Sequence, residues 1–148
     1  MRTSPNRVLA LIVGCIAIAA LAAALFAASR PAAELSPTSP EGVVQAYLNT
    51  VLDGDHERAT TFFAADSQCD ADDLDRAYVN PRVRVDLVSS RTTGDRAFVT
   101  IDVTTSSDGP FNDSYTEQHS YRLSRDGTSW RITGVPWPLY DCGLVMVK

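Results

Sequence analysis

The chain opens with a long apolar run. From residue 8 to residue 28 it reads VLALIVGCIAIAALAAALFAA, 21 residues without a charge or a proline. At about 1.5 Å per helical residue, such a run spans roughly 30 Å, the thickness of a bilayer core. Arg2 and Arg7 precede it and Arg30 follows it, a bias that favours a cytoplasmic N-terminus. The pattern predicts a single-pass anchor in the plasma membrane, with the C-terminal domain outside the cytoplasm.

Two alternatives remain open for this segment. A cleavable signal peptide has an apolar run of about 7 to 15 residues and a small-residue cut site. The stretch LFAASR offers such a site, although the run before it is longer. The stretch IVGC, which ends at Cys15, is similar to the box in which bacterial lipoproteins are lipidated. Because apolar sequence continues well beyond Cys15, we expect this residue to be a small apolar part of the anchor.

A proline-rich stretch, SRPAAELSPTSP, follows the apolar run and is typical of a short extended stalk. The sequence therefore predicts four parts: a cytoplasmic N-terminus (1–7), a transmembrane anchor (8–28), a stalk (29–39) and an exported domain (40–148).

A helical period marks the start of this domain. SPEGVVQAYLNTVLDGD begins with a serine cap and a proline, places Val43, Tyr47 and Val51 on one stripe, and ends at Gly54. Asp55 can cap a second helix, HERATTFFAA, and DADDLDRAY predicts a short third one. The acids of that third segment suit a helix N-terminus, and they lack the glycine and ligand phase of a calcium loop.

From residue 82 the apolar period changes to two. Successive runs alternate strictly, and TTGDR and RDG offer turns between them. Helices followed by four meandering strands predict an α+β domain, in which the helices cover one face of a curved antiparallel four-stranded sheet. The apolar positions of the first two strands are Val83, Val85 and Leu87, then Ala97, Val99, Ile101 and Val103.

Charge narrows the possible partners. After residue 30 the chain has ten basic and 18 acidic residues, a formal charge of −8. A domain with this balance is not expected to bind nucleic acid or an anionic membrane surface.

Two cysteines lie in the predicted exported domain, where thiols tend to oxidise. A disulfide between Cys69 and Cys142 would close a loop of 73 residues. In the chain-entropy model such a loop is worth roughly 4 kcal/mol. The rival is a zinc site made by both cysteines with His56 and His119. Their scattered spacing resembles no zinc motif, so neither a metal nor another cofactor is predicted.

The order of elements and the local sequences resemble the nuclear transport factor 2-like superfamily. The residues that carry the resemblance are PEGVVQAYLNTVLDGDHERATTFF and GTSWRITG, within about residues 40–135. More narrowly, DLDRAYV and PWPLYDCG are similar to small membrane-anchored exported proteins of actinobacteria. The resemblance implies a cystatin-like cone of helices against a curved sheet, and it makes a homodimer possible. Steroid isomerases and dehydratases of this fold use carboxylates and tyrosines inside the cone.

Strand parity indicates which polar groups would face such a cone. Asp86 and Asp102 alternate with apolar residues and should point outward. In the third strand, Glu117, His119 and Tyr121 share the face of Leu123, which suggests that they project inward. With Tyr47 on the first helix of the domain, these three residues make a hypothetical ligand-binding cavity.

A carboxylate beside a histidine can do acid–base work, but the two can also simply pair with each other. Because no nucleophile motif accompanies Glu117 and His119, no catalytic residue and no enzymatic activity are predicted. The favoured function is an interaction or accessory module that contacts a cell-envelope protein. The alternatives are a carrier of a small apolar ligand and an enzyme using this pair. A filled cone favours the module, an empty apolar cone the carrier, and a cone with converging polar groups the enzyme.

Overall fold

The computed structural model describes residues 5–28, 34–80, 82–106 and 114–142. They belong to two compact units, Met1–Glu34 and Leu35–Lys148. Residues 29–33 of the expected stalk and residues 143–148 of the expected domain lie outside the described part.

The first unit contains one helix, α1 (Pro5–Ala28), and its Cys15 is a free, exposed cysteine. A helical membrane span requires about 20 consecutive apolar residues. Within the described part of the chain, no helix has the length and apolar character needed to cross a membrane. The predicted transmembrane anchor at residues 8–28, the membrane attachment through it and the single-pass plasma-membrane location are therefore corrected. The structure has a 24-residue helix in this region.

The second unit begins with α2 (Pro40–Leu52), which starts where predicted and ends two residues before Gly54. The Ser39 hydroxyl accepts a hydrogen bond from the amide of Gly42 at 3.1 Å, and Pro40 occupies the first turn. A Cβ on Gly42 would lie 1.8 Å from the Ser36 carbonyl oxygen, so the incoming chain passes where only glycine leaves room. The helix ends at Leu52, and Gly54, just beyond it, has a φ of 77° that suits a glycine.

Two short helices follow, α3 (His56–Thr60) and α4 (Ala71–Arg76). Each is capped by the aspartate before it, and Asp70 and Asp73 form a reciprocal capping box on α4. The predicted second helix, HERATTFFAA, is too long. Its last residues leave the helix because Phe63 forms an isolated parallel bridge with Ile132, and the backbone of Ile132 bonds both Phe62 and Ala64.

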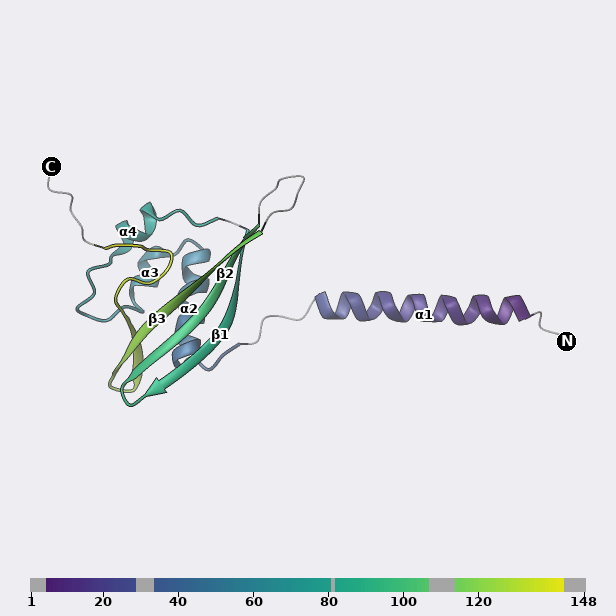
Figure 1. Ribbon diagram of the computed structural model, residues 1–148, viewed down its shortest axis with the longest axis horizontal. Helices are drawn as coiled ribbons and strands as arrows, with labels where there is room; N and C mark the ends of the chain where they lie inside the picture. The colour runs from purple at the N-terminus through teal and green to yellow at the C-terminus, as the bar shows by residue number, and fades with distance from the viewer. Residues whose placement is uncertain (1–4, 29–33, 81, 107–113, 143–148) are drawn as a thin grey trace. The chain divides into compact units, whose positions relative to one another are not determined.

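The sheet contains four described strands, β1 (Val83–Thr93), β2 (Arg96–Ser106), β3 (Ser114–Asp126) and β4 (Ser129–Thr133). All neighbours are antiparallel, in the order β1-β2-β3-β4. The predicted α+β class with an antiparallel four-stranded sheet is therefore confirmed. Figure 1 shows α2 lying along one face of the twisted sheet. A register shift between Leu87 and Ser89 changes which residues of β1 face that side.

The two sheet faces differ in chemistry. The inner face carries the core, to which α2 contributes Tyr47 and its apolar neighbours. The outer face carries cross-strand polar pairs, such as Thr100 with Ser120 at 3.1 Å and Asp102 with Gln118 at 3.0 Å. Asp86 is bonded by Arg84 on this face, so the expected outward direction of Asp86 and Asp102 is confirmed.

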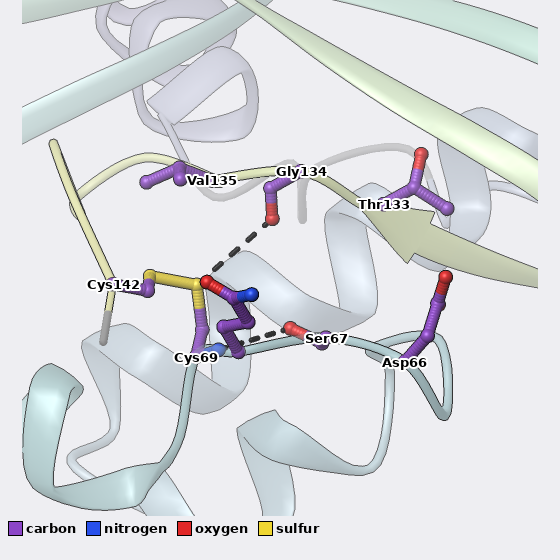
Figure 2. Close-up of a pocket in the computed structure, with 8 residues that line it drawn as sticks. Asp66, Ser67, Cys69, Thr133, Gly134, Val135 and Cys142 are labelled. Atoms are coloured by element: carbon purple, nitrogen blue, oxygen red, sulfur yellow. Dashed lines mark hydrogen bonds between the residues drawn. A yellow bond between two sulfur atoms is a disulfide. The ribbon is translucent and has the colours of Figure 1, made fainter. Parts of the chain in front are cut away.

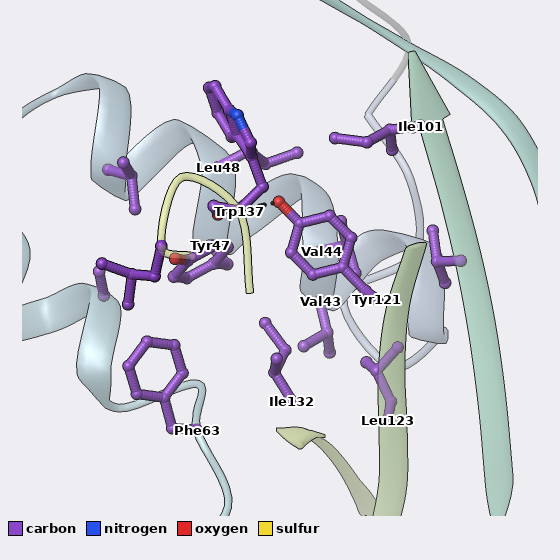
Figure 3. Packing of buried hydrophobic residues seen from close by; sticks show 14 of the residues in the cluster. Val43, Val44, Tyr47, Leu48, Phe63, Ile101, Tyr121, Leu123, Ile132 and Trp137 are labelled. Carbon is purple, nitrogen blue, oxygen red and sulfur yellow. Dashed lines mark hydrogen bonds between the residues drawn. The ribbon is translucent and has the colours of Figure 1, made fainter. Parts of the chain in front are cut away.

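The chain leaves β4 through a segment that we call the strap, residues 135–142. Trp137 and Leu139 of the strap are buried in the core, and Tyr121 donates a hydrogen bond to the carbonyl of Trp137 at 3.1 Å (Figure 3). The disulfide between Cys69 and Cys142 ties the strap to the segment between α3 and α4, as predicted. Tyr140 of the strap, by contrast, is 76% exposed.

Candidate functional site

The four residues of the hypothetical cavity do lie on the inner side of the sheet, in two pairs. The rings of Tyr47 and Tyr121 meet edge to face, with their centroids 6.0 Å apart. The Nε2 atom of His119 lies 3.5 Å from a carboxylate oxygen of Glu117. We call these four residues and Trp137 the interior polar cluster.

Trp137 connects the two pairs. Its ring centroid lies 6.0 Å from that of His119, and its backbone carbonyl accepts the hydrogen bond of Tyr121. Figure 3 shows Trp137 beside the hydroxyl end of Tyr121, above Tyr47. The space into which the predicted residues project is therefore occupied by the chain's own strap. The sequence pattern alone did not bring Trp137 into contact with the predicted cavity residues.

Burial dominates the electrostatics of the two tyrosines. Desolvation raises the pKa of Tyr47 well above its usual range, since α2 and the sheet exclude water from its phenol. Desolvation also raises the pKa of Tyr121, and the nearby phenol of Tyr47 adds to the effect. Both side chains are therefore neutral phenols at physiological pH, available as hydrogen-bond donors rather than as bases.

Two polar atoms of the cluster are buried without a hydrogen-bond partner among the described residues. They are the hydroxyl oxygen of Tyr47 and the Nε2 atom of His119. A buried polar group without a partner costs stability, so such atoms are uncommon in proteins. The side chains of His119 and Glu117 are 21% and 41% exposed, so this pair lies at the rim of the core. Chemically, the cluster can donate and accept hydrogen bonds.

A separate pocket of about 230 Å³ lies beside the disulfide (Figure 2). Asp66, Ser67 and Gln68 line one side of it, while Thr133 and Gly134 line another. None of the four predicted cavity residues lines this pocket. The sequence indicated the disulfide, but it carried no signal that a hollow would form next to it.

Both cysteines of the disulfide are buried and line the wall of this pocket. Cys69 and Cys142 are 8% and 9% exposed, and the amide of Cys69 donates a hydrogen bond to the Ser67 hydroxyl at 3.2 Å. The Sγ atom of Cys69 also lies 3.9 Å from the carbonyl oxygen of Gly134. Because the sulfur is in a disulfide and carries no hydrogen, this is a contact rather than a hydrogen bond.

The candidate metal ligands are not brought together. Among the described residues, no group of three or more histidines, cysteines and acids could hold a metal ion. The two cysteines of the zinc alternative are joined to each other, and metal binding requires free thiolates. His56 instead pairs with Asp75 of α4.

Comparison with known proteins identifies a shared fold but no family. The chain is similar to the solution structure of a SEC-C motif containing protein from Rhodopseudomonas palustris, with a TM-score of 0.54 and 16% identity over 74% of this chain and 83% of that one. No family model matches the chain, and no curated protein matches it either. At this identity, the likeness concerns the fold alone.

The resemblance to the nuclear transport factor 2-like superfamily is therefore corrected. A solved structure that shares this fold is a SEC-C motif containing protein, and neither comparison by sequence supports the superfamily or an actinobacterial exported protein. The resemblance rested on the order of helices and strands and on two local stretches. Such an order recurs in unrelated α+β domains, because a helix and an antiparallel sheet can cover each other in few ways.

Proposed function

We propose that the Leu35–Lys148 unit is a non-enzymatic interaction or accessory module. One observation carries this proposal: Trp137 occupies the inner side of the sheet, where Glu117 and His119 would have to meet a substrate. An acid–base pair needs a reacting group within hydrogen-bond distance, directly or through one water. With the strap in place, the ring of Trp137 lies beside His119, with the two ring centroids 6.0 Å apart.

The chemistry of the cluster supports the same proposal. Tyr47 and Tyr121 are neutral, and the hydroxyl of Tyr121 already donates a hydrogen bond to the backbone carbonyl of Trp137. The contact between His119 and Glu117 is long at 3.5 Å, as in a peripheral ion pair. Tyr121 and His119 are thus in contact with the strap, and binding of a partner is left to the exposed surface of the domain.

The experiment is covalent capture of a partner. The tagged full-length protein is produced in its native cells, cross-linked, purified under denaturing conditions and analysed by mass spectrometry. A protein enriched reproducibly over an unrelated tagged domain, and absent without cross-linker, is the expected result. Failure to enrich any protein at several cross-linker lengths would refute the module.

A second candidate is a carrier of a small apolar ligand, and one observation favours it. The hydroxyl of Tyr47 and the Nε2 atom of His119 are buried without partners, so a ligand with one polar group could satisfy them if the strap moved. Native mass spectrometry of protein purified without detergent tests this candidate. A stoichiometric bound compound that is lost in Tyr47→Phe would favour the carrier over the module.

A further inference from the structure

The arginines of the Leu35–Lys148 unit are unevenly distributed. Of nine arginines between residues 35 and 142, four lie at one end of the outer sheet face, one on each strand. This end is the one nearest the β1–β2 and β3–β4 turns. The rest of the unit is strongly acidic, so this concentration of positive charge is local. The four residues are Arg91, Arg96, Arg122 and Arg131.

An exposed aromatic ring lies among these arginines. Phe98 is 47% exposed, while its strand neighbours Ala97 and Val99 are fully buried, so its ring points away from the core. In the sheet register Phe98 is directly opposite Arg91 on β1 and Arg122 on β3. Directly opposite side chains start about 5 Å apart, and their stems are therefore neighbours of the ring.

Arg96 is a third arginine near Phe98 on the outer sheet face. It lies two residues before Phe98 on β2, so both side chains are on the same face. One rung of the ladder contains Arg91, Phe98 and Arg122, and the next contains Arg96 and Arg131. We call Arg91, Arg96, Phe98 and Arg122 the arginine–phenylalanine patch.

The arginines of this patch differ from others of the unit in having no carboxylate partner. Arg76 pairs with Asp73, and Arg84 pairs with Asp86. In the part of the chain that the structure describes, no carboxylate lies within ion-pair distance of Arg91, Arg96 or Arg122. Arg131 is excluded from the patch because it already donates to the carbonyl of Thr61.

Three arginines without a carboxylate partner, on the same sheet face as an exposed ring, match a specific kind of ligand. Guanidinium groups bind carboxylates through paired hydrogen bonds, and an exposed phenylalanine offers apolar contact area. Aromatic residues and arginine are also the types that carry most binding energy in protein interfaces. An extended phosphate polymer fits less well, because it would reach beyond the patch over a unit whose overall charge is strongly negative.

We propose that the arginine–phenylalanine patch binds an acidic protein segment in which an apolar residue is flanked by carboxylates. The apolar residue packs on Phe98 while the carboxylates pair with Arg91, Arg96 and Arg122. This inference rests on the proposed interaction function and names its surface and the chemistry of its partner.

The probe is a fluorescein-labelled ten-residue peptide of aspartate and glutamate with one central leucine, titrated with oxidised full-length protein. Binding is measured by fluorescence anisotropy. The control peptide has asparagine and glutamine in place of the acids. We expect the acidic peptide to bind, and Arg122→Ser or Phe98→Ser to weaken it by roughly tenfold or more, as for interface hot spots. Added salt should weaken it further, because the contacts are ionic.

The matched protein control is Arg84→Ser, which removes one positive charge from the opposite end of the same sheet face. It should leave peptide affinity unchanged if the patch is specific. All substituted side chains are exposed, so thermal unfolding should confirm that each variant stays folded. An equal loss of affinity in Arg84→Ser, equal binding of the amide peptide, or no binding to wild type would overturn the proposal.

Three other results would also overturn the proposal. They are preferential binding of anionic phospholipid vesicles, preferential binding of single-stranded RNA, and dimerisation that Arg122→Ser abolishes.

Covalent capture with Arg122→Ser separates this inference from the function on which it rests. A partner that is captured equally by wild type and variant refutes the patch and leaves the interaction module intact, whereas no capture by wild type refutes the module itself.

Discussion

Removal of the disulfide is the change whose size the structure allows us to calculate most directly. Cys69 and Cys142 are 73 residues apart, and all four strands lie between them. In the chain-entropy model, opening a loop of this length costs about 4 kcal/mol. A domain of this size has a total stability of about 5–15 kcal/mol. Either Cys69→Ser or Cys142→Ser is therefore expected to remove a large share of it.

The two single variants and the double variant should cost nearly the same free energy of unfolding. Both residues contribute to one bond, so the second replacement has no bond left to break. The expected loss corresponds to a decrease in Tm of about 15 °C or more. Cys15→Ser is the matched control, since Cys15 is a free cysteine in the other unit, and it should leave the unfolding of this domain unchanged.

The assay is urea unfolding of oxidised protein, followed by tryptophan fluorescence and by circular dichroism. Fluorescence reports on Trp137 in the strap and on Trp130 in β4, both of which are buried. If a single variant costs less than about 1 kcal/mol, or if the double variant costs the sum of the singles, the account of the strap as a tethered segment is wrong. Two free thiols in protein purified under oxidising conditions would also refute it.

Three further predictions concern pH and backbone conformation. Burial raises the pKa of Tyr121 above its ordinary value of 10.0, so stability should be complete below pH 10 and fall above it. Tyr121→Phe should reduce this alkaline loss, at a cost of about 1 kcal/mol near neutrality for the hydrogen bond to Trp137, both read from urea midpoints across pH. Burial raises the pKa of Glu41, but hydrogen bonds from its own backbone, Ser90 and Ser39 outweigh this and lower it below 4.5. The stability that Glu41 contributes should therefore be present above pH 4.5 and disappear as the pH falls through the lowered pKa. In Glu41→Gln, the free energy of unfolding should change less with pH between pH 4.5 and that lowered pKa. Gly134 has a φ of 80°, so Gly134→Ala should cost about 1–2 kcal/mol in thermal unfolding, and an unchanged Tm would contradict the backbone assignment.

Local signals explain which parts of the fold could be predicted. The cap at Ser39, the proline after it and the glycine at residue 54 are all within or next to α2, and its start was predicted correctly, while its end lies two residues before Gly54. The end of α3 depends on the pairing of Phe63 with Ile132, which lies far away in the sequence. No local pattern around Phe63 distinguishes a residue that continues a helix from one that joins a sheet edge.

The same reasoning applies to the sites. Parity correctly placed Glu117, His119 and Tyr121 on the inner face, since β3 is regular. In β1, the register shift after Leu87 places Arg91 on the outer face, whereas uninterrupted alternation from Val83 would place it on the inner face. The patch around Phe98 could therefore not be predicted from alternation alone, because the shift moves the side chain of every later residue of β1 to the opposite face of the sheet.

The position of the disulfide also has a consequence for turnover of the protein. All four strands lie inside the covalent ring closed by Cys69 and Cys142, whereas α2 and α3 lie outside it. A protease that cuts the backbone once within the ring leaves both pieces joined through sulfur, so the sheet can keep its pairing. A single cut in the segment between α3 and Cys69 separates α2 from the sheet with no covalent link remaining. Separation of the strands thus requires either two cuts in the ring or one cut followed by reduction of the disulfide, whereas separation of α2 from the sheet requires one cut.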